Sequence, residues 1–275
     1  MIRLTTMLCL LISIGADAQY YYKDIISPAQ TNERINQYRK QRVRTVNVVS
    51  FENNGERTED FAGSQNISSD YKRITTSFNT PMSGSSELTT HFDANGKLVK
   101  SVDTTDGSHS ESQYFYDDNG SLTRITNVST SAGNKIEKED HYWHYNSSGK
   151  PEKMLRVKNN TDTTYVTFTL DENGNVAEEN STRKSKALPP YYYYYDAQNR
   201  LTDIVSYNDK AKRLLPLYIF EYGESGQLAS MLVVPEGTDD YQKWIYEYNA
   251  SGLKVKETCL NKRKQVLGRV EYAYR

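Results

Sequence analysis

The stretch Tyr116-Asp-Asp-Asn-Gly120-Ser-Leu122 decides the fold, because six other stretches of the chain follow the same pattern. The pattern is an aromatic or apolar residue, an Asx-rich turn, a glycine and an aliphatic residue. An acidic or amide side chain that begins such a turn can hydrogen-bond the backbone two residues on, and the turn is closed by a residue at positive φ. Asparagine is the next residue best able to adopt that conformation. The predicted turn residues are Gly96, Gly120, Gly149, Gly174, Asn199, Gly226 and Gly252.

The segment before each turn has the alternation of a β-strand. Residues two apart lie on one face of a strand. Two positions before the pattern begins, six of the seven segments carry an aromatic residue: Tyr114, Trp143, Phe168, Tyr193, Phe220 and Tyr246. The turn residues are 24 to 29 positions apart, which is typical of a repeat architecture. The sequence therefore predicts a series of β-hairpins with one aromatic face.

Seven hairpins give roughly 14 strands, and an open sheet of that size tends to curl, split or close. We therefore expect an all-β fold in which tandem β-hairpins form a long curled antiparallel meander sheet. The sequence does not distinguish an open sheet from a closed barrel. A short N-terminal helix is predicted from Ser27-Pro28 and the stretch 30–43 that follows, with Ser27 as its N-cap and Pro28 at its first position.

Three domains are expected. Residues 1–18 have the zones of a secretory signal peptide: a basic start, an apolar run over 4–14, and Ala16 and Ala18 as the small residues of a cleavage site. Residues 19–87 are expected to form the helix and an irregular β cap, and residues 88–275 the seven-hairpin domain. Cleavage between Ala18 and Gln19 leaves Cys259 as the remaining cysteine, so no internal disulfide can form. We expect a secreted, periplasmic or cell-surface protein.

Composition excludes several classes of protein. The net charge is −1, which gives no global basis for nucleic-acid binding. Mean hydropathy is −0.78, and both strand faces carry Lys, Glu, Thr and Tyr, so a lipid-facing band of alternate aliphatic residues is missing. The chain is therefore not expected to span a membrane. Basic clusters at 39–44 and 262–264 are predicted to be solvated surface, with contact to anionic lipid or polysaccharide as the alternative.

The stretch Tyr193-Tyr-Tyr195-Asp-Ala-Gln-Asn199-Arg-Leu201 resembles the YD repeat of the RHS family, whose pattern is Y-x-Y-D-x-x-G-R-L. Looser versions begin at Phe92, Tyr116 and Tyr248, so the resemblance extends over 88–275. It implies a hairpin fold and an extracytoplasmic setting. The family builds a large shell around a toxin domain, and seven units are too few to enclose such a cargo. Short cytoplasmic antitoxins carry similar hairpins, but the signal-peptide pattern argues against that branch.

Motifs that carry chemistry are missing from the sequence. No nucleophile elbow, phosphate loop or zinc-protease motif occurs. His141 and His144 are three apart and face opposite sides of a strand, so a shared metal is not expected. Asp-rich turns such as 116–122 lack the ligand spacing of calcium loops. We therefore expect no catalytic residue, no metal and no cofactor. The alternative is an enzyme of unknown class, such as a carbohydrate-active hydrolase, on a repeat scaffold.

A second set of aromatic side chains is predicted on the strand face opposite the main stripe. Its members are Phe115, Tyr142, His144, Tyr165, Tyr192 and Tyr194. Tyrosine-rich patches are typical of interaction surfaces, and their rings stack on flat apolar ligand faces such as sugars. Alternatively, loops or curvature partly cover both faces. The sequence favours an exported, non-catalytic binding or structural protein of the bacterial envelope or exterior, with a polysaccharide or an envelope or secreted protein as partner.

Overall fold

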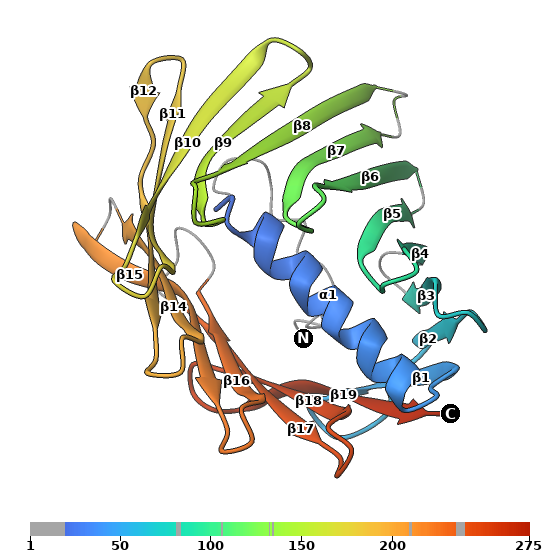
Figure 1. Cartoon of the computed structure of the whole chain (residues 1–275). Coiled ribbons are helices and arrows are strands. Elements are labelled where there is room, and N and C mark those ends of the chain that lie inside the picture. The colour runs from blue at the N-terminus through green and yellow to red at the C-terminus, as the bar shows by residue number, and fades with distance from the viewer. Residues whose placement is uncertain are drawn as a thin grey trace. The chain divides into compact units, whose positions relative to one another are not determined.

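The structure is a computed structural model that describes residues 20–80, 84–105, 107–131, 133, 135–208, 211–234 and 240–275. The predicted signal peptide and its cleavage site before Gln19 lie outside the described residues. Figure 1 shows the elements, which are α1 (Lys23–Lys40), β1 (Thr45–Glu52), β2 (Ala62–Ile67), β3 (Arg73–Thr80), β4 (Gly84–Phe92), β5 (Leu98–Thr105), β6 (Ser108–Tyr116), β7 (Leu122–Thr130), β8 (Ile136–Tyr145), β9 (Pro151–Lys158), β10 (Asp162–Leu170), β11 (Val176–Arg183), β12 (Lys186–Ala187), β13 (Tyr191–Tyr195), β14 (Leu201–Asn208), β15 (Arg213–Tyr222), β16 (Leu228–Val233), β17 (Gln242–Tyr248), β18 (Lys254–Asn261) and β19 (Val266–Tyr274).

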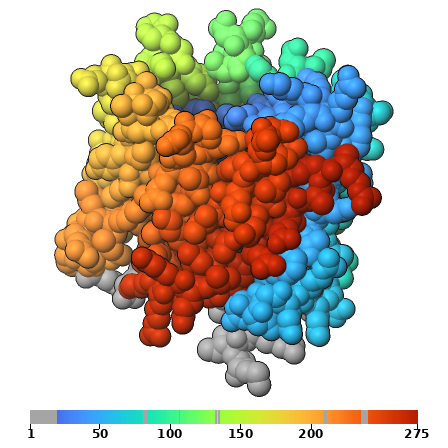
Figure 2. Space-filling view, turned by 90° about the horizontal axis from the view of Figure 1, so that it is seen from below, coloured from blue at the N-terminus to red at the C-terminus, as the bar shows by residue number. Residues whose placement is uncertain are grey.

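The described chain divides into two compact units. The larger unit comprises Tyr21–Val46, Ala62–Pro190 and the last two residues, and therefore holds α1 and β2 to β12. The smaller unit comprises Tyr20, Asn47–Phe61 and Tyr191–Ala273, and holds most of β1 and all of β13 to β18. In the larger unit, α1 lies along the concave side of the arc of strands from β3 to β10 (Figure 1). Figure 2 shows the orange-to-red strands of the smaller unit as a continuous surface of side chains.

The strand pairing corrects the predicted fold class. The 19 strands form one sheet in which β1 pairs with both β2 and β19. The order of hydrogen-bonded strands therefore returns to its beginning, and the described residues form a closed antiparallel β-barrel with one helix. The expected fold class, a long curled meander sheet of tandem hairpins, is therefore wrong, because the strands close into a barrel. Closure is favourable because the unpaired N–H and C=O groups of the two end strands acquire partners.

The helix is present, but its predicted start is wrong. It begins at Lys23 rather than at Pro28, and Pro28 lies inside it. The backbone N–H groups of Tyr21 and Tyr22 donate to the carboxylate of Glu179 on β11, at 2.8 to 3.0 Å. This carboxylate caps the N-terminus of the helix from a distant strand, and Ser27 does not act as the N-cap. Pro28 is tolerated because its missing N–H removes one hydrogen bond of the first turns only.

All seven turn residues have positive φ. The angles are 80° at Gly96, 82° at Gly120, 72° at Gly149, 78° at Gly174, 58° at Asn199, 81° at Gly226 and 79° at Gly252. The Asp171 turn shows the common geometry: the Gly174 N–H donates to the Asp171 carbonyl at 3.0 Å, and the Asp171 carboxylate accepts from the N–H groups of Asn173 and Asn175. A further turn of this geometry, over 261–265, has Lys264 at φ 61° in place of glycine.

Tyrosine and leucine of the recurring pattern are joined by hydrogen bonds between neighbouring hairpins. The tyrosine that precedes a turn donates its hydroxyl to the carbonyl of the leucine that follows the previous turn. Among the described residues, bonds of this kind join Tyr116 to Leu98 at 2.8 Å, Tyr145 to Leu122 at 2.7 Å, Tyr222 to Leu201 at 2.8 Å and Tyr248 to Leu228 at 2.9 Å. The spacing of tyrosine and leucine thus serves contacts between hairpins as well as the turn itself.

Candidate functional site

The predicted aromatic residues fall in both units. Phe115, Tyr142, His144 and Tyr165 lie on β6, β8 and β10 of the larger unit, whereas Tyr192 and Tyr194 lie on β13 of the smaller unit. Tyr165 is 64% exposed and Tyr194 49% exposed, His144 is also exposed, and the other three are half-buried. Their faces are opposite those of the buried Trp143 and Tyr193, as the period of two requires.

Strand register brings three of these rings into line. Phe115 pairs with Arg124 and Arg124 with Tyr142; Tyr142 pairs with Leu155 and Leu155 with Tyr165. These five residues, here called the aromatic row, cross five neighbouring strands. Their rings lie on alternate strands, which places them about 10 Å apart. The Arg124 guanidinium lies 3.9 Å from the centre of the Phe115 ring, so a cation is held within the row.

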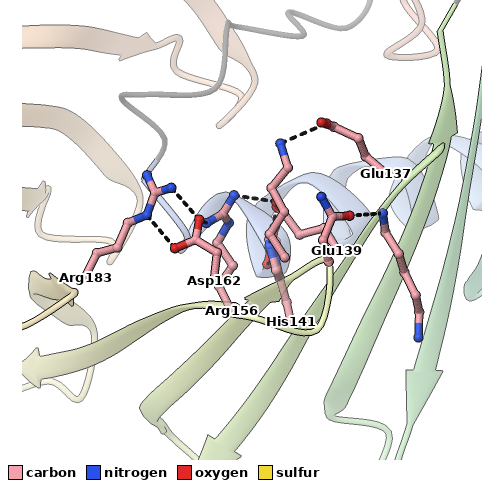
Figure 3. Close-up of polar contacts among 10 residues, drawn as sticks. Glu137, Glu139, His141, Arg156, Asp162 and Arg183 are labelled. Atoms are coloured by element: carbon pink, nitrogen blue, oxygen red, sulfur yellow. Dashed lines mark hydrogen bonds and ion pairs between the residues drawn. The ribbon is translucent and has the colours of Figure 1, made fainter. Parts of the chain in front are cut away.

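A second cluster, which we call the charge chain, lies on the opposite face of β8, β9 and β10 and extends to α1 and β11. Figure 3 shows its members on the strands. Its members alternate in charge, and they are Asp24, His141, Glu139, Arg156, Asp162 and Arg183. The cross-strand pairing of His141 with Arg156, and of Arg156 with Thr164, puts these side chains on one face. All of them belong to the larger unit.

His141 is the most enclosed member of the charge chain. It is 6% exposed; its Nδ1 lies 2.6 Å from the Asp24 carboxylate and its Nε2 2.9 Å from that of Glu139. Burial lowers the pKa of His141, but the two carboxylates outweigh burial and raise that pKa to about 9. The ring is therefore an imidazolium at neutral pH, with both N–H groups donating.

Glu139 and Asp162 of the charge chain are held as carboxylates. Burial raises the pKa of Glu139, but His141 and Arg156 outweigh it and lower that pKa to about 2. The Arg156 guanidinium lies 2.6 Å from Glu139 and 3.8 Å from Asp162, and the Arg183 Nε donates to Asp162 at 2.9 Å. The hydrogen bond from Arg183 lowers the pKa of Asp162. Each charge thus faces opposite charges, which is what allows such groups to be buried.

The charge chain fastens the first turn of α1 to the sheet. Asp24 belongs to that turn, and its carboxylate accepts from both His141 and, at 3.3 Å, the Trp143 indole. Glu179 receives the backbone N–H groups of Tyr21 and Tyr22 just before it. Sequence analysis missed this cluster, although Glu139, His141 and Trp143 alternate along one strand face. The alternation shows that these three side chains share one face of the strand, but it does not show that Asp24 of the helix, 117 positions from His141, contacts that face.

Each unit also has a shallow groove. In the larger unit a groove of about 320 Å³ runs between α1 and the turns of three hairpins, and residues from Tyr22 to Asn32 form one wall. In the smaller unit a groove of about 310 Å³ is lined by β1, β17, β18 and β19. Among the described residues, no group of three or more His, Cys, Asp or Glu side chains is placed to hold a metal ion. No described helix is long and apolar enough to cross a membrane.

Comparisons with known proteins give fold-level likeness alone. No family model matches the chain, and no curated protein matches it. The solved structures that resemble it include a crystal structure of TcdB2–TccC3–Cdc42 (15% identity, TM-score 0.36) and the Tc holotoxin pore of Photorhabdus luminescens (14%, 0.35). Each of these two matches covers 78% of this chain but only 12% of the other chain. A porin-like protein from Bacteroides uniformis has 10% identity and a TM-score of 0.40 over 85% of this chain and 98% of that one.

These similarities are too weak to carry an argument about function. Nothing among them confirms an RHS or YD repeat. The fold and the two clusters define the class: a closed antiparallel β-barrel that carries the charge chain on one face of its sheet and the aromatic row on the other. That class fits a structural or binding role at a coarse level.

Proposed function

We propose that this protein is an exported, non-catalytic binding module of the bacterial envelope or exterior, and that the aromatic row binds an extended polysaccharide. The observation that carries the proposal is the register of Phe115, Tyr142 and Tyr165 on alternate strands of one face. Export is supported by the signal-peptide pattern of residues 1–18, which lie outside the described residues.

The ligand class follows from the geometry of the row. Rings about 10 Å apart on a sheet face offer stacking sites at the length of a disaccharide unit. Arg124 contributes N–H donors between two of the rings, and sugar hydroxyls are suitable acceptors. A straight row across five strands suits a linear chain better than a globular protein surface, which needs a broad patch.

The non-catalytic part of the proposal rests on the charge chain. A general base needs a lone pair, but both nitrogens of His141 donate to carboxylates. Glu139 and Asp162 are each held by arginine, which keeps them ionised and unsuited to donating a proton. The charge chain is thus an arrangement for fastening α1 rather than for acid–base chemistry.

Binding to linear oligosaccharides of increasing length, measured by calorimetry after a glycan array has selected the sugar, tests the proposal. The variant Tyr142→Ala/Tyr165→Ala should bind roughly tenfold or more weakly, because it removes two stacking rings. Affinity in the wild type should rise until the oligosaccharide reaches all three rings. Tyr192→Ala/Tyr194→Ala measures whether β13 contributes to the same binding.

The matched control is Tyr207→Ala on β14, since Tyr207 is also exposed (42%) but lies outside the row. It should leave the affinity unchanged. Wild-type affinity in the double variant, or failure of the array to find any bound glycan, would overturn the proposal. An equal loss in the Tyr207 control would show that tyrosine exposure in general, and not the row, is responsible.

A further inference from the structure

The residue that directly follows a turn glycine, or Asn199, contacts the next hairpin in several places, and we call it the brace position. The Lys97 amine donates to the Gly120 carbonyl at 3.1 Å and lies 5.1 Å from the centre of the Tyr116 ring. The Arg200 guanidinium lies 4.5 Å from the centre of the Tyr222 ring. Gln227 donates to the Gly252 carbonyl at 3.1 Å. A long polar side chain in this position therefore covers the next tyrosine ring, reaches the next glycine carbonyl, or does both.

Ser121 occupies the brace position that faces Tyr145 and Gly149. A serine side chain is too short to reach across to the next hairpin. In the described part of the chain no cation lies over the Tyr145 ring, and no side chain donates to the Gly149 carbonyl. The groove of about 320 Å³ is found at this point, and Ser121, Tyr145 and Gly149 are among its lining residues. The groove thus exposes the two groups that a brace covers elsewhere.

The electrostatics around Tyr145 favour a positive ligand. Burial, and then the negative charges of Asp117 and Asp24, raise the pKa of the Tyr145 hydroxyl. Asp24 also lines the groove, where its carboxylate is shared with His141. Lys150 is the one lining lysine, and its side chain extends to the following turn, at Gly174, as Lys97 does to Gly120.

We propose that this groove binds an organic cation, a primary ammonium or guanidinium group on an apolar stem, over the Tyr145 ring with the Gly149 carbonyl as acceptor. The stem would lie against Leu122, Pro151 and Ile25, which also line the groove. The cation takes the position that Lys97 and Arg200 take over their tyrosines, where the face of the ring attracts positive charge. The site is separate from the aromatic row, so it does not depend on the proposed polysaccharide binding.

Titration with n-butylammonium, followed by amide chemical shifts in NMR, tests the site. Shifts should concentrate at the 117–122 and 145–150 turns, and n-butanol, a neutral molecule of the same length, should bind roughly tenfold more weakly or not at all. 1,5-Diaminopentane and Nα-acetyl-lysine amide then distinguish a free diamine from a lysine side chain as the natural source. Equal binding of butanol and butylammonium, or no binding of butylammonium, overturns the proposal.

Two substitutions of Ser121 add a measurement of stability that does not depend on small-molecule affinity, and two substitutions of Tyr145 test the ring itself. Ser121→Lys supplies the brace from the chain itself, so it should raise Tm and abolish butylammonium binding. Ser121→Met has similar length without charge and controls for filling the groove; it should stabilise less than lysine. Tyr145→Phe keeps the ring and should retain binding, whereas Tyr145→Leu should lose it. A Ser121→Lys variant that is no more stable than Ser121→Met would contradict the cation site.

Discussion

At Gly120 a side chain meets two obstacles, one in the backbone and one in the surrounding space. The backbone has φ of 82°, a conformation that L-residues other than Asn and Asp rarely adopt. A Cβ added there would also clash with the Lys97 amine, which must move and give up its bond to the Gly120 carbonyl. Gly149 has φ of 72° but open space around it. The pair therefore separates backbone strain from the cost of displacing a brace.

We expect Gly149→Ala to lower the free energy of unfolding by about 1–2 kcal/mol, from backbone strain alone. Gly120→Ala should cost roughly 0.5–1.5 kcal/mol more, because it also removes the Lys97 hydrogen bond. Asn199→Gly should be neutral or slightly stabilising, since it relieves a residue at φ 58°. Urea unfolding of the three variants gives these values; equal losses at Gly120 and Gly149 would show that the brace contributes nothing.

The sequence predicted the backbone conformation or strand face of a residue correctly where that type of residue has a single physical role. Glycine after an Asx-rich turn marks positive φ, and the period of two marks the strand face of Tyr165 and Tyr194. It missed the turn at Lys264, where a lysine takes φ of 61° because the hairpin of β18 and β19 imposes it. Composition alone does not reveal a strained residue that the surrounding pairing maintains.

The helix α1 is fastened to the larger unit by polar contacts along its length. Asp24 and the N–H groups before it meet His141 and Glu179. In its middle, the side-chain amide oxygen of Asn32 accepts from the Leu98 N–H at 2.7 Å, and near its end the Tyr38 hydroxyl donates to the Gln65 side chain at 2.9 Å. A helix held in this way depends on charge and hydrogen bonding more than on an apolar stripe.

The charge on His141 should make stability depend on pH. Its pKa is raised to about 9 in the folded protein, against an ordinary value of 6.5. The stabilisation is therefore complete below about pH 6.5 and is lost as the pH rises through about 9. His141→Gln should flatten this part of the profile. Urea unfolding between pH 6 and 10, with hydrogen exchange of the α1 amides, measures both effects.

Glu139 provides the matched case at low pH. Because its folded pKa is lowered to about 2, its contribution is present above about pH 4.5 and is lost as the pH falls through about 2. A profile that stays flat from pH 6 to 10 in the wild type would mean that His141 is not charged in the folded protein. The sequence alone could not predict the raised pKa of His141, because its partner Asp24 is 117 positions away.

Closure is a property of the whole molecule that no single hairpin determines. Within the described chain, β1 completes the ring of strands by pairing with both β2 and β19. The sequence predicted the hairpins that follow residue 88, but the pairing of β1 with β19 leaves no comparable mark, since these two strands are distant in sequence. Local turn chemistry fixes neighbours along the chain, whereas closure depends on twist and stagger summed over all strands.

Closure should make unfolding cooperative over both units. Trp143 reports on the larger unit and Trp244 on the smaller one, and each is 3% exposed. In the single-tryptophan variants Trp244→Phe and Trp143→Phe, the urea midpoint by fluorescence should coincide with the midpoint by far-UV circular dichroism. A fluorescence midpoint that departs from the circular dichroism midpoint in either variant would show that the units unfold separately.

The bonds from Tyr116, Tyr145, Tyr222 and Tyr248 to the leucine of the preceding hairpin have an evolutionary consequence. A hairpin copied in tandem at the level of the gene carries its own tyrosine and its own leucine. The copy can therefore join its neighbours on both sides without compensating changes elsewhere. A single duplication or deletion of a hairpin can therefore produce a barrel of larger or smaller circumference. Between the hairpins that contain Ser121 and Tyr145, the brace residue has diverged while the bond from Tyr145 to Leu122 is kept.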